Sequence, residues 1–127
     1  MKINYRPLKE LLSVEDNWCQ GSYVKTAQGK VTTFDSEDAA RFCLSGAVVK
    51  IYRRSKIERT AVWYISTHVM SRIQQIINDM TGHSLCITDF NDTKSFADVK
   101  AVLDKLPDEE TITLTTYENS TTTTNNY

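Results

Sequence analysis

The chain has 127 residues, of which 40% are hydrophobic and 24% are charged, as is typical of one soluble globular domain. Fifteen Lys and Arg residues nearly balance sixteen Asp and Glu residues, so no overall charge favours nucleic acid or an anionic membrane as a partner. No apolar run approaches the roughly 20 residues of a membrane span, and the N-terminus does not resemble a signal peptide. We therefore expect a cytoplasmic protein that does not bind membranes.

The sequence predicts neither a metal site nor a cofactor. The three cysteines, Cys19, Cys43 and Cys86, are too far apart for a zinc motif of the CxxC type, and only His68 and His83 could add ligands. Neither GxxxxGK[ST] nor GxGxxG is present, so neither motif provides a phosphate site. In a cytoplasmic protein we expect the cysteines to be reduced and mostly buried.

The first third of the chain predicts a short helix and a hairpin. Residues 7–13 begin with Pro7, which suits a first helical position, and continue with a small leucine stripe. Residues 23–26 and 30–34 are rich in β-branched and aromatic side chains, and Gly29 lies in the turn between them. Two strands alone are marginal in water, so the hairpin needs a helix or a third strand.

Residues 35–52 predict one long helix around which the other elements pack. Asp35 or Ser36 would cap it, and Gly46 inside it indicates a close approach of another helix or a slight kink, or else a backbone left open for a ligand. Apolar side chains recur at helical spacing and predict a buried face: Ala40, Cys43, Leu44, Ala47, Val48 and Ile51.

The second half predicts two further helices with an extended segment between them. A helix over 61–80 ends at Gly82, and the short alternating segment 85–90 is typical of a buried strand. Asn91 and Asp92 are expected in a turn, before a helix that Ser95 and Asp98 begin with a capping box.

The expected fold is α+β, with three to four helices packed against a small antiparallel sheet. The hairpin forms the sheet, together with 85–90 or with 111–117, a β-branched segment that could also pair across a dimer. Residues 1–117 are expected to form a single domain. Residues 118–127 are a Thr/Asn-rich tail that we expect to be disordered.

No catalytic residue is predicted. Cys43 lies on the apolar face of the expected 35–52 helix, away from its N-terminus, and has no basic neighbour in sequence to lower its pKa. Cys19 has a better setting beside Trp18, and it could form a set with His68 or His83 and with Asn91 or Asp92. Chance alone supplies many such sets, so a cysteine-dependent hydrolase is an alternative hypothesis only.

Three motifs occur in a fixed order along the chain. They are Trp18-Cys-Gln-Gly21, then Cys43-Leu-Ser-Gly-Ala47, then Phe90-Asn-Asp92 before the last helix. In this order the chain resembles a family of small bacterial and phage proteins of unknown function, DUF6197. The resemblance covers roughly residues 8–106, and the chain departs from it in its longer 53–84 region and in 108–117.

The resemblance implies no reaction, but it implies that residues of the three motifs lie together. They would form either a structural polar knot or a shallow binding pocket. The binding candidates are Trp18, Gln20, Asn91 and Asp92, and the structural candidates are Gly21, Cys43, Gly46 and Ala47.

From the absence of a catalytic set we expect a small non-enzymatic protein that binds a protein partner, and a homo-oligomer is compatible with the sequence. The resemblance suggests a phage or mobile-element protein that binds or inhibits a host protein or takes part in assembly. A protein that captures a small molecule or nucleotide near Trp18 and Asn91 is a further alternative.

Overall fold

The computed structural model describes residues 1–53, 59–82 and 85–113, and for residues 59–63 the backbone alone. Within these ranges the fold is α+β, as predicted, although the strands form two separate antiparallel pairs rather than one sheet. The helices are α1 (Arg6–Leu11), α2 (Leu44–Val48), α3 (Arg59–Thr81), α4 (Ile87–Thr93) and α5 (Phe96–Asp104). The strands are β1 (Lys2–Asn4), β2 (Val24–Thr26), β3 (Ala39–Phe42) and β4 (Glu109–Thr111).

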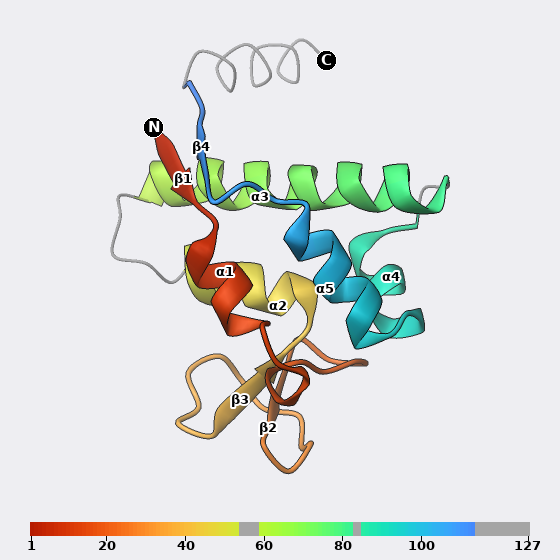
Figure 1. Ribbon diagram of the computed structural model, residues 1–127. Coiled ribbons are helices and arrows are strands. Elements are labelled where there is room, and N and C mark those ends of the chain that lie inside the picture. Colours follow the sequence, from red (N-terminus) through yellow and green to blue (C-terminus); the bar gives the residue numbers. More distant parts are fainter. Residues whose placement is uncertain (54–58, 83–84, 114–127) are drawn as a thin grey trace, which may run out of the picture.

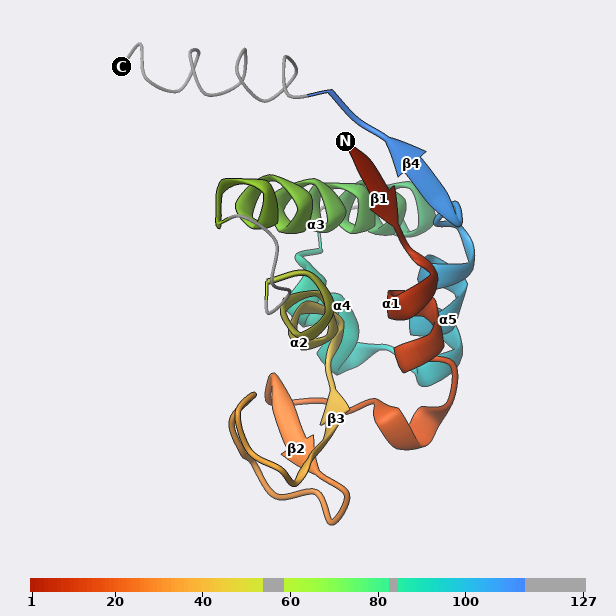
Figure 2. The same cartoon turned by 90° about the vertical axis from the view of Figure 1, so that its left-hand side faces the viewer.

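The elements are arranged in tiers. In Figures 1 and 2, α3 lies along one side, the shorter helices lie beneath it, and β2 and β3 form the opposite end. Val69, Ile73 and Ile77 of α3 are fully buried and belong to the same apolar core as Leu44 and Phe90. In the part of the chain described here, no helix is long and apolar enough to cross a membrane.

The prediction of one helix over 35–52 is wrong. Residues 39–42 form β3, which pairs with β2, and the helix begins only at Leu44. The helix α2 is short and continues into a π-helical segment, Val49–Arg53. The apolar spacing misled because Ala40 of the predicted face lies in the strand, whereas Leu44, Ala47 and Val48 of the same face are buried on the helix.

The hairpin prediction is correct only in part. Gly29 lies in a tight turn with φ +86°, and a single bridge joins Lys25 to Val31. The continuous partner of β2, however, is β3 and not residues 30–34. The expected third strand therefore comes from the segment that was predicted to be helical.

The predicted strand at 85–90 and the predicted turn at Asn91-Asp92 are both wrong. Residues 87–93 form α4, whose N-cap is Cys86, with its sulfur accepting the backbone N–H of Asp89. Asn91 and Asp92 therefore lie on a helix. One turn of helix and a short strand both suit an apolar run of this length, so the pattern did not distinguish them.

Three predicted helices are confirmed, with shifts of one or two residues at their ends. Pro7 lies in the first turn of α1, and α3 stops before Gly82, which has φ +67°. At α5, the Ser95 side chain accepts the Asp98 N–H and the Asp98 carboxylate accepts the Ser95 N–H, as a capping box requires.

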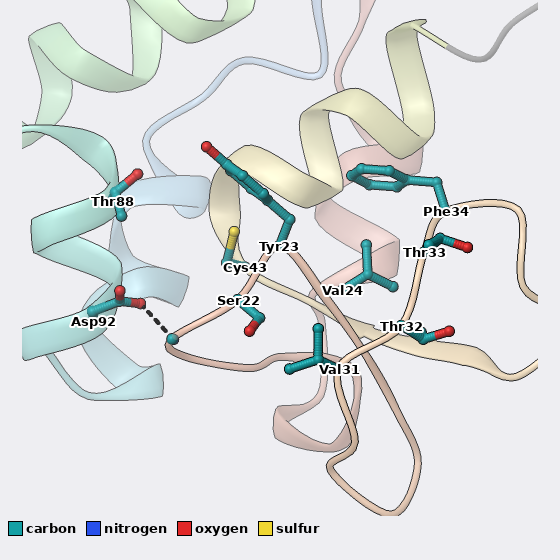
Figure 3. Close-up of a pocket in the computed structure, with 11 residues that line it drawn as sticks. Ser22, Tyr23, Val24, Val31, Thr32, Thr33, Phe34, Cys43, Thr88 and Asp92 are labelled. Carbon is teal, nitrogen blue, oxygen red and sulfur yellow. Dashed lines mark hydrogen bonds between the residues drawn. The ribbon is translucent and has the colours of Figure 1, made fainter.

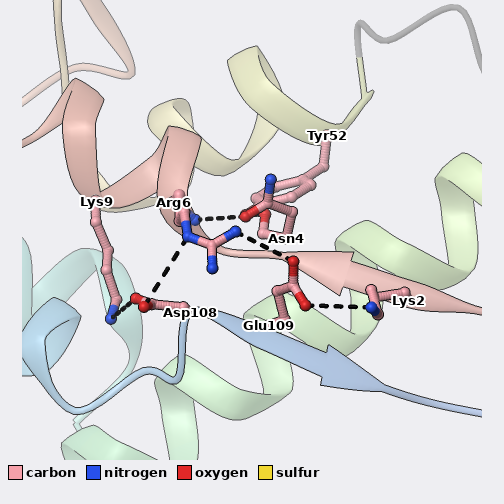
Figure 4. A network of polar contacts seen from close by, with 7 residues as sticks. All are labelled: Lys2, Asn4, Arg6, Lys9, Tyr52, Asp108 and Glu109. Atoms are coloured by element: carbon pink, nitrogen blue, oxygen red, sulfur yellow. Dashed lines mark hydrogen bonds and ion pairs between the residues drawn. The ribbon is translucent and has the colours of Figure 1, made fainter.

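The two chain ends of the described fold meet in an antiparallel pair, β1 with β4. Figure 4 shows polar contacts around this pair: Lys2 and Arg6 pair with Glu109 at 3.2 and 3.1 Å, and the hydroxyl of the buried Tyr52 donates to the Asn4 carbonyl. The strand β4 thus shares only Thr111 with the predicted strand 111–117, and residues 112 and 113 lie outside it. Residues 114–117 and the tail 118–127 lie outside the described residues, and a single domain over 1–117 stays a prediction.

On the inner face of this pair, Glu110 is the centre of a second polar cluster. Its carboxylate accepts the Tyr5 hydroxyl at 2.7 Å and lies 2.9 Å from His68 Nε2 and 3.3 Å from Arg72 Nη2. Burial raises the pKa of Glu110, but the hydrogen bonds from Tyr5 and His68 and the nearby Arg72 charge bring that pKa below its usual value. This cluster ties β4 to α3.

Candidate functional site

The three sequence motifs meet at one fully buried side chain, Asn91 of α4. Its Oδ1 accepts the indole N–H of Trp18 at 2.7 Å and the backbone N–H of Leu44 at 3.0 Å. Its Nδ2 donates to the Cys19 carbonyl and to Asp92 Oδ1, both at 3.0 Å. An amide has two donor hydrogens and two acceptor lone pairs, so the hydrogen-bonding capacity of Asn91 is filled from inside the protein.

The neighbouring residues extend this cluster along the 18–21 segment. The Gln20 side-chain amide donates to the backbone carbonyls of Asn91 and Lys94, at 3.0 and 2.9 Å. The Asp92 carboxylate accepts the Gly21 N–H at 2.9 Å, and Gly21 has φ +81°, a conformation that glycine adopts without strain. The four predicted binding residues thus lie together, and we name them, with Gly21, the Asn91 knot.

Apolar packing supports the knot at its edge. The Trp18 and Phe96 rings are tilted against each other with centroids 5.7 Å apart, which joins the 18–21 segment to α5. The knot therefore holds together three parts of the chain that are distant in sequence, residues 18–21, Leu44 and residues 91–96. Between the two alternatives left open by the sequence, the filled Asn91 side chain favours a structural knot at this residue.

The second motif, at the start of α2, provides a site of very close packing. A methyl group added at Gly46 would overlap the backbone carbonyl of Tyr23. The same carbonyl accepts the Cys43 N–H at 3.2 Å, and the Cys43 sulfur accepts the Gly46 N–H. Ala47 is fully buried beside them. Gly46 thus permits a close approach, as expected, although the neighbour is the chain leading into β2 rather than a helix.

The environments of Cys19 and Cys43 do not favour thiolate chemistry. Contrary to prediction, Cys43 is at a helix N-terminus, as the N-cap of α2, but burial raises its pKa more than the helix N–H groups lower it. Burial likewise raises the pKa of Cys19 to about 11, and its thiol donates to the Ser22 carbonyl. His68 pairs with Glu110 instead, and His83 lies outside the described residues.

Next to the knot lies an open, mostly apolar cleft of about 530 Å³. Figure 3 shows Tyr23 in this cleft between Thr88 of α4 and Phe34, with Val31 and Val24 along the strand side and Asp92 at the end near α4. We name it the Tyr23 cleft. Of the predicted residues, Gly21, Cys43 and Asp92 line it, whereas Trp18 and Gln20 line a smaller hollow on the other side of the 18–21 segment.

Two side chains of this cleft are unusually exposed for apolar residues. Tyr23 is 58% exposed and Val31 is 71% exposed. Neither residue is among the site residues predicted from the sequence. Alternation along residues 23–26 is the sequence signal that could have indicated the exposure of Tyr23. Successive side chains of an extended segment point to opposite faces, and Val24 is buried, so Tyr23 points to the other face.

A second cleft, of about 560 Å³, shares Tyr23 and Phe34 with the first and continues between α2 and α3. Arg53, Ser45 and Ser66 line it, and we name it the Arg53 cleft. Among residues 1–53, 59–82 and 85–113, no group of His, Cys, Asp and Glu side chains is arranged to hold a metal ion.

Comparison with known proteins agrees with the resemblance noted from the three motifs. A search of curated proteins and a search of solved structures each found no match. The model of a family described as "Family of unknown function (DUF6197)" matches residues 5–109, a range that includes all three motifs and the Asn91 knot. The chain therefore belongs to the DUF6197 family.

Proposed function

We propose that this protein is a non-enzymatic binding module that docks an extended segment of a partner protein in the Tyr23 cleft. The observation that carries the proposal is the exposed Tyr23 ring on a firmly held backbone. Its carbonyl is packed against Gly46 and hydrogen-bonded to the Cys43 N–H. An aromatic side chain that needs little ordering on binding is typical of interface hot spots.

Charge at the cleft specifies the chemistry of the segment. Asp92 is exposed, and its Oδ1 accepts both hydrogen bonds of the knot, from Gly21 and Asn91. Its other carboxylate oxygen is therefore available at the cleft wall. The occupant that fits is a segment with an apolar side chain over Tyr23 and Val31 and a Lys or Arg beside Asp92.

A peptide-display selection on the purified protein tests this directly. We expect enriched peptides that contain an apolar residue next to a basic one and that bind the soluble protein in a titration. Tyr23→Ala should weaken binding of a selected peptide at least tenfold, and Asp92→Asn should weaken peptides with Lys or Arg more than versions with Gln there.

The matched control is Val14→Ala, because Val14 is 51% exposed but does not line the cleft. The proposal fails if the selection yields no peptide, or if Tyr23→Ala and Val14→Ala bind equally well. It also fails if Tyr23 instead mediates association of two copies, which light scattering at rising protein concentration would show. A host or phage protein as the natural partner remains a prediction from the family resemblance.

A further inference from the structure

The Arg53 cleft has a different lining from the Tyr23 cleft. Its lining mixes hydroxyl groups and a cation, from Ser45, Ser66 and Arg53, with apolar side chains that include Val48 and Met70. Its volume of about 560 Å³ lies within the roughly 300–1,000 Å³ common for small-molecule sites. The lining combines apolar surface with a few polar groups, as such sites usually do.

Ser45 places a hydroxyl group at the wall of this cleft. The residue as a whole is 8% exposed and lines the cleft, and no hydrogen bond of its side chain occurs within the described residues. The hydroxyl oxygen is not fully shielded from solvent, so it can donate to or accept from a ligand that enters the cleft. The hydroxyl lies on α2, one residue before Gly46.

Arg53 supplies a positive charge at the same cleft. Its Nε donates to the Ser66 hydroxyl at 3.4 Å, and Ser66 is only 2% exposed. Across the part of the chain described by the structure, Arg53 has no ion pair. A guanidinium with free donors beside hydroxyl groups is suited to a planar or tetrahedral anionic group.

We propose that the Arg53 cleft is a binding site for a small organic anion with an apolar or aromatic body. Arg53 and the Ser45 hydroxyl contact the anionic group, and Val48, Met70 and the two shared aromatic residues contact the body. The site does not depend on the protein-binding role of the Tyr23 cleft, although an occupant would touch Tyr23 from the other side.

Two fluorescent probes separate the anionic group from the apolar body. 8-Anilinonaphthalene-1-sulfonate has both, and N-phenyl-1-naphthylamine has the same ring system without the sulfonate. We expect the sulfonate probe to bind the folded protein with a saturable fluorescence increase. Arg53→Gln should weaken this binding at least tenfold and Ser45→Ala several-fold, while the affinity for the neutral probe stays within twofold.

Lys50→Gln is the matched control, because it removes an exposed positive charge from the same π-helical segment without lining the cleft. It should leave the sulfonate probe's affinity within twofold of the native value. Ser45→Ala should keep or raise the midpoint of denaturant unfolding, since the hydroxyl loses no partner. Absence of saturable binding overturns the proposal, as does equal weakening by Lys50→Gln and Arg53→Gln or equal affinity for the two probes.

Discussion

The Asn91 knot and the Tyr23 cleft lie side by side, but they differ in how much of their side chains is left available to a partner. In the knot, the central amide is fully buried and each of its hydrogen-bonding positions is used inside the chain. In the cleft, an aromatic ring is left more than half exposed. The three motifs thus build the scaffold, and the surface that they hold in place is the better candidate for binding.

The largest expected effect comes from breaking the knot at its centre. Asn91→Ala leaves the Trp18 and Leu44 N–H groups and the Cys19 carbonyl buried without their partner, which should lower the free energy of unfolding by about 4 kcal/mol. Urea unfolding measures this loss of stability. Asn78→Ala, which removes one partly exposed side-chain hydrogen bond with Gln74, serves as the control and should cost less than about 1 kcal/mol. Similar losses in both variants would contradict a special role for Asn91.

The second largest effect is expected at Gly46, where α2 is in close contact with the backbone of Tyr23. Gly46→Ala overlaps the Tyr23 backbone and should lower the free energy of unfolding by about 3 kcal/mol, because backbone on both sides must shift. Gly29→Ala is the control. Its φ is +86° but open space surrounds it, so only the conformational cost of about 1 kcal/mol applies. Equal costs would mean that the contact with Tyr23 is not tight.

The pH dependence of stability probes the thiol at the edge of the knot. Burial raises the pKa of Cys19 in the folded protein to about 11, above the ordinary thiol value of 9.0. Its contribution is therefore fully present below pH 9 and is lost as the pH rises from about 9 to 11, because the unfolded thiol ionises first. Cys19→Ser should make the alkaline loss shallower by about 1 kcal/mol. Unfolding curves at pH 8 and 11 test this, and identical slopes would contradict it.

The sequence predicts a helix well where several local signals coincide. The stop at Gly82 and the capping box of Ser95 and Asp98 are local chemistry, and both are found in the structure. Residues 39–42 show the opposite case. Their strand exists because β2 lies beside them, and this tertiary pairing leaves no mark in a pattern that also fits a helix.

The sequence predicted which residues lie together in the candidate site, but it did not predict what each of them does. The three motifs do bring Trp18, Gln20 and Asp92 to Asn91. That Asn91 is satisfied internally depends on four contacts from three segments, which no spacing reveals. The exposure of Tyr23 and the unpartnered Ser45 likewise depend on how α2 meets β2 and α3.

Among these variants, Tyr23→Ala should change stability least. Comparing Tyr23→Ala with Asn91→Ala by urea unfolding is the most direct test of whether the knot is the scaffold and the cleft is the binding surface. Tyr23 contributes mainly its backbone to the fold, so removing its exposed ring should change the free energy of unfolding by less than about 0.5 kcal/mol. Asn91→Ala should lose about 4 kcal/mol. A large loss for Tyr23→Ala together with a small loss for Asn91→Ala would contradict the assignment of scaffold to the knot and binding to the cleft.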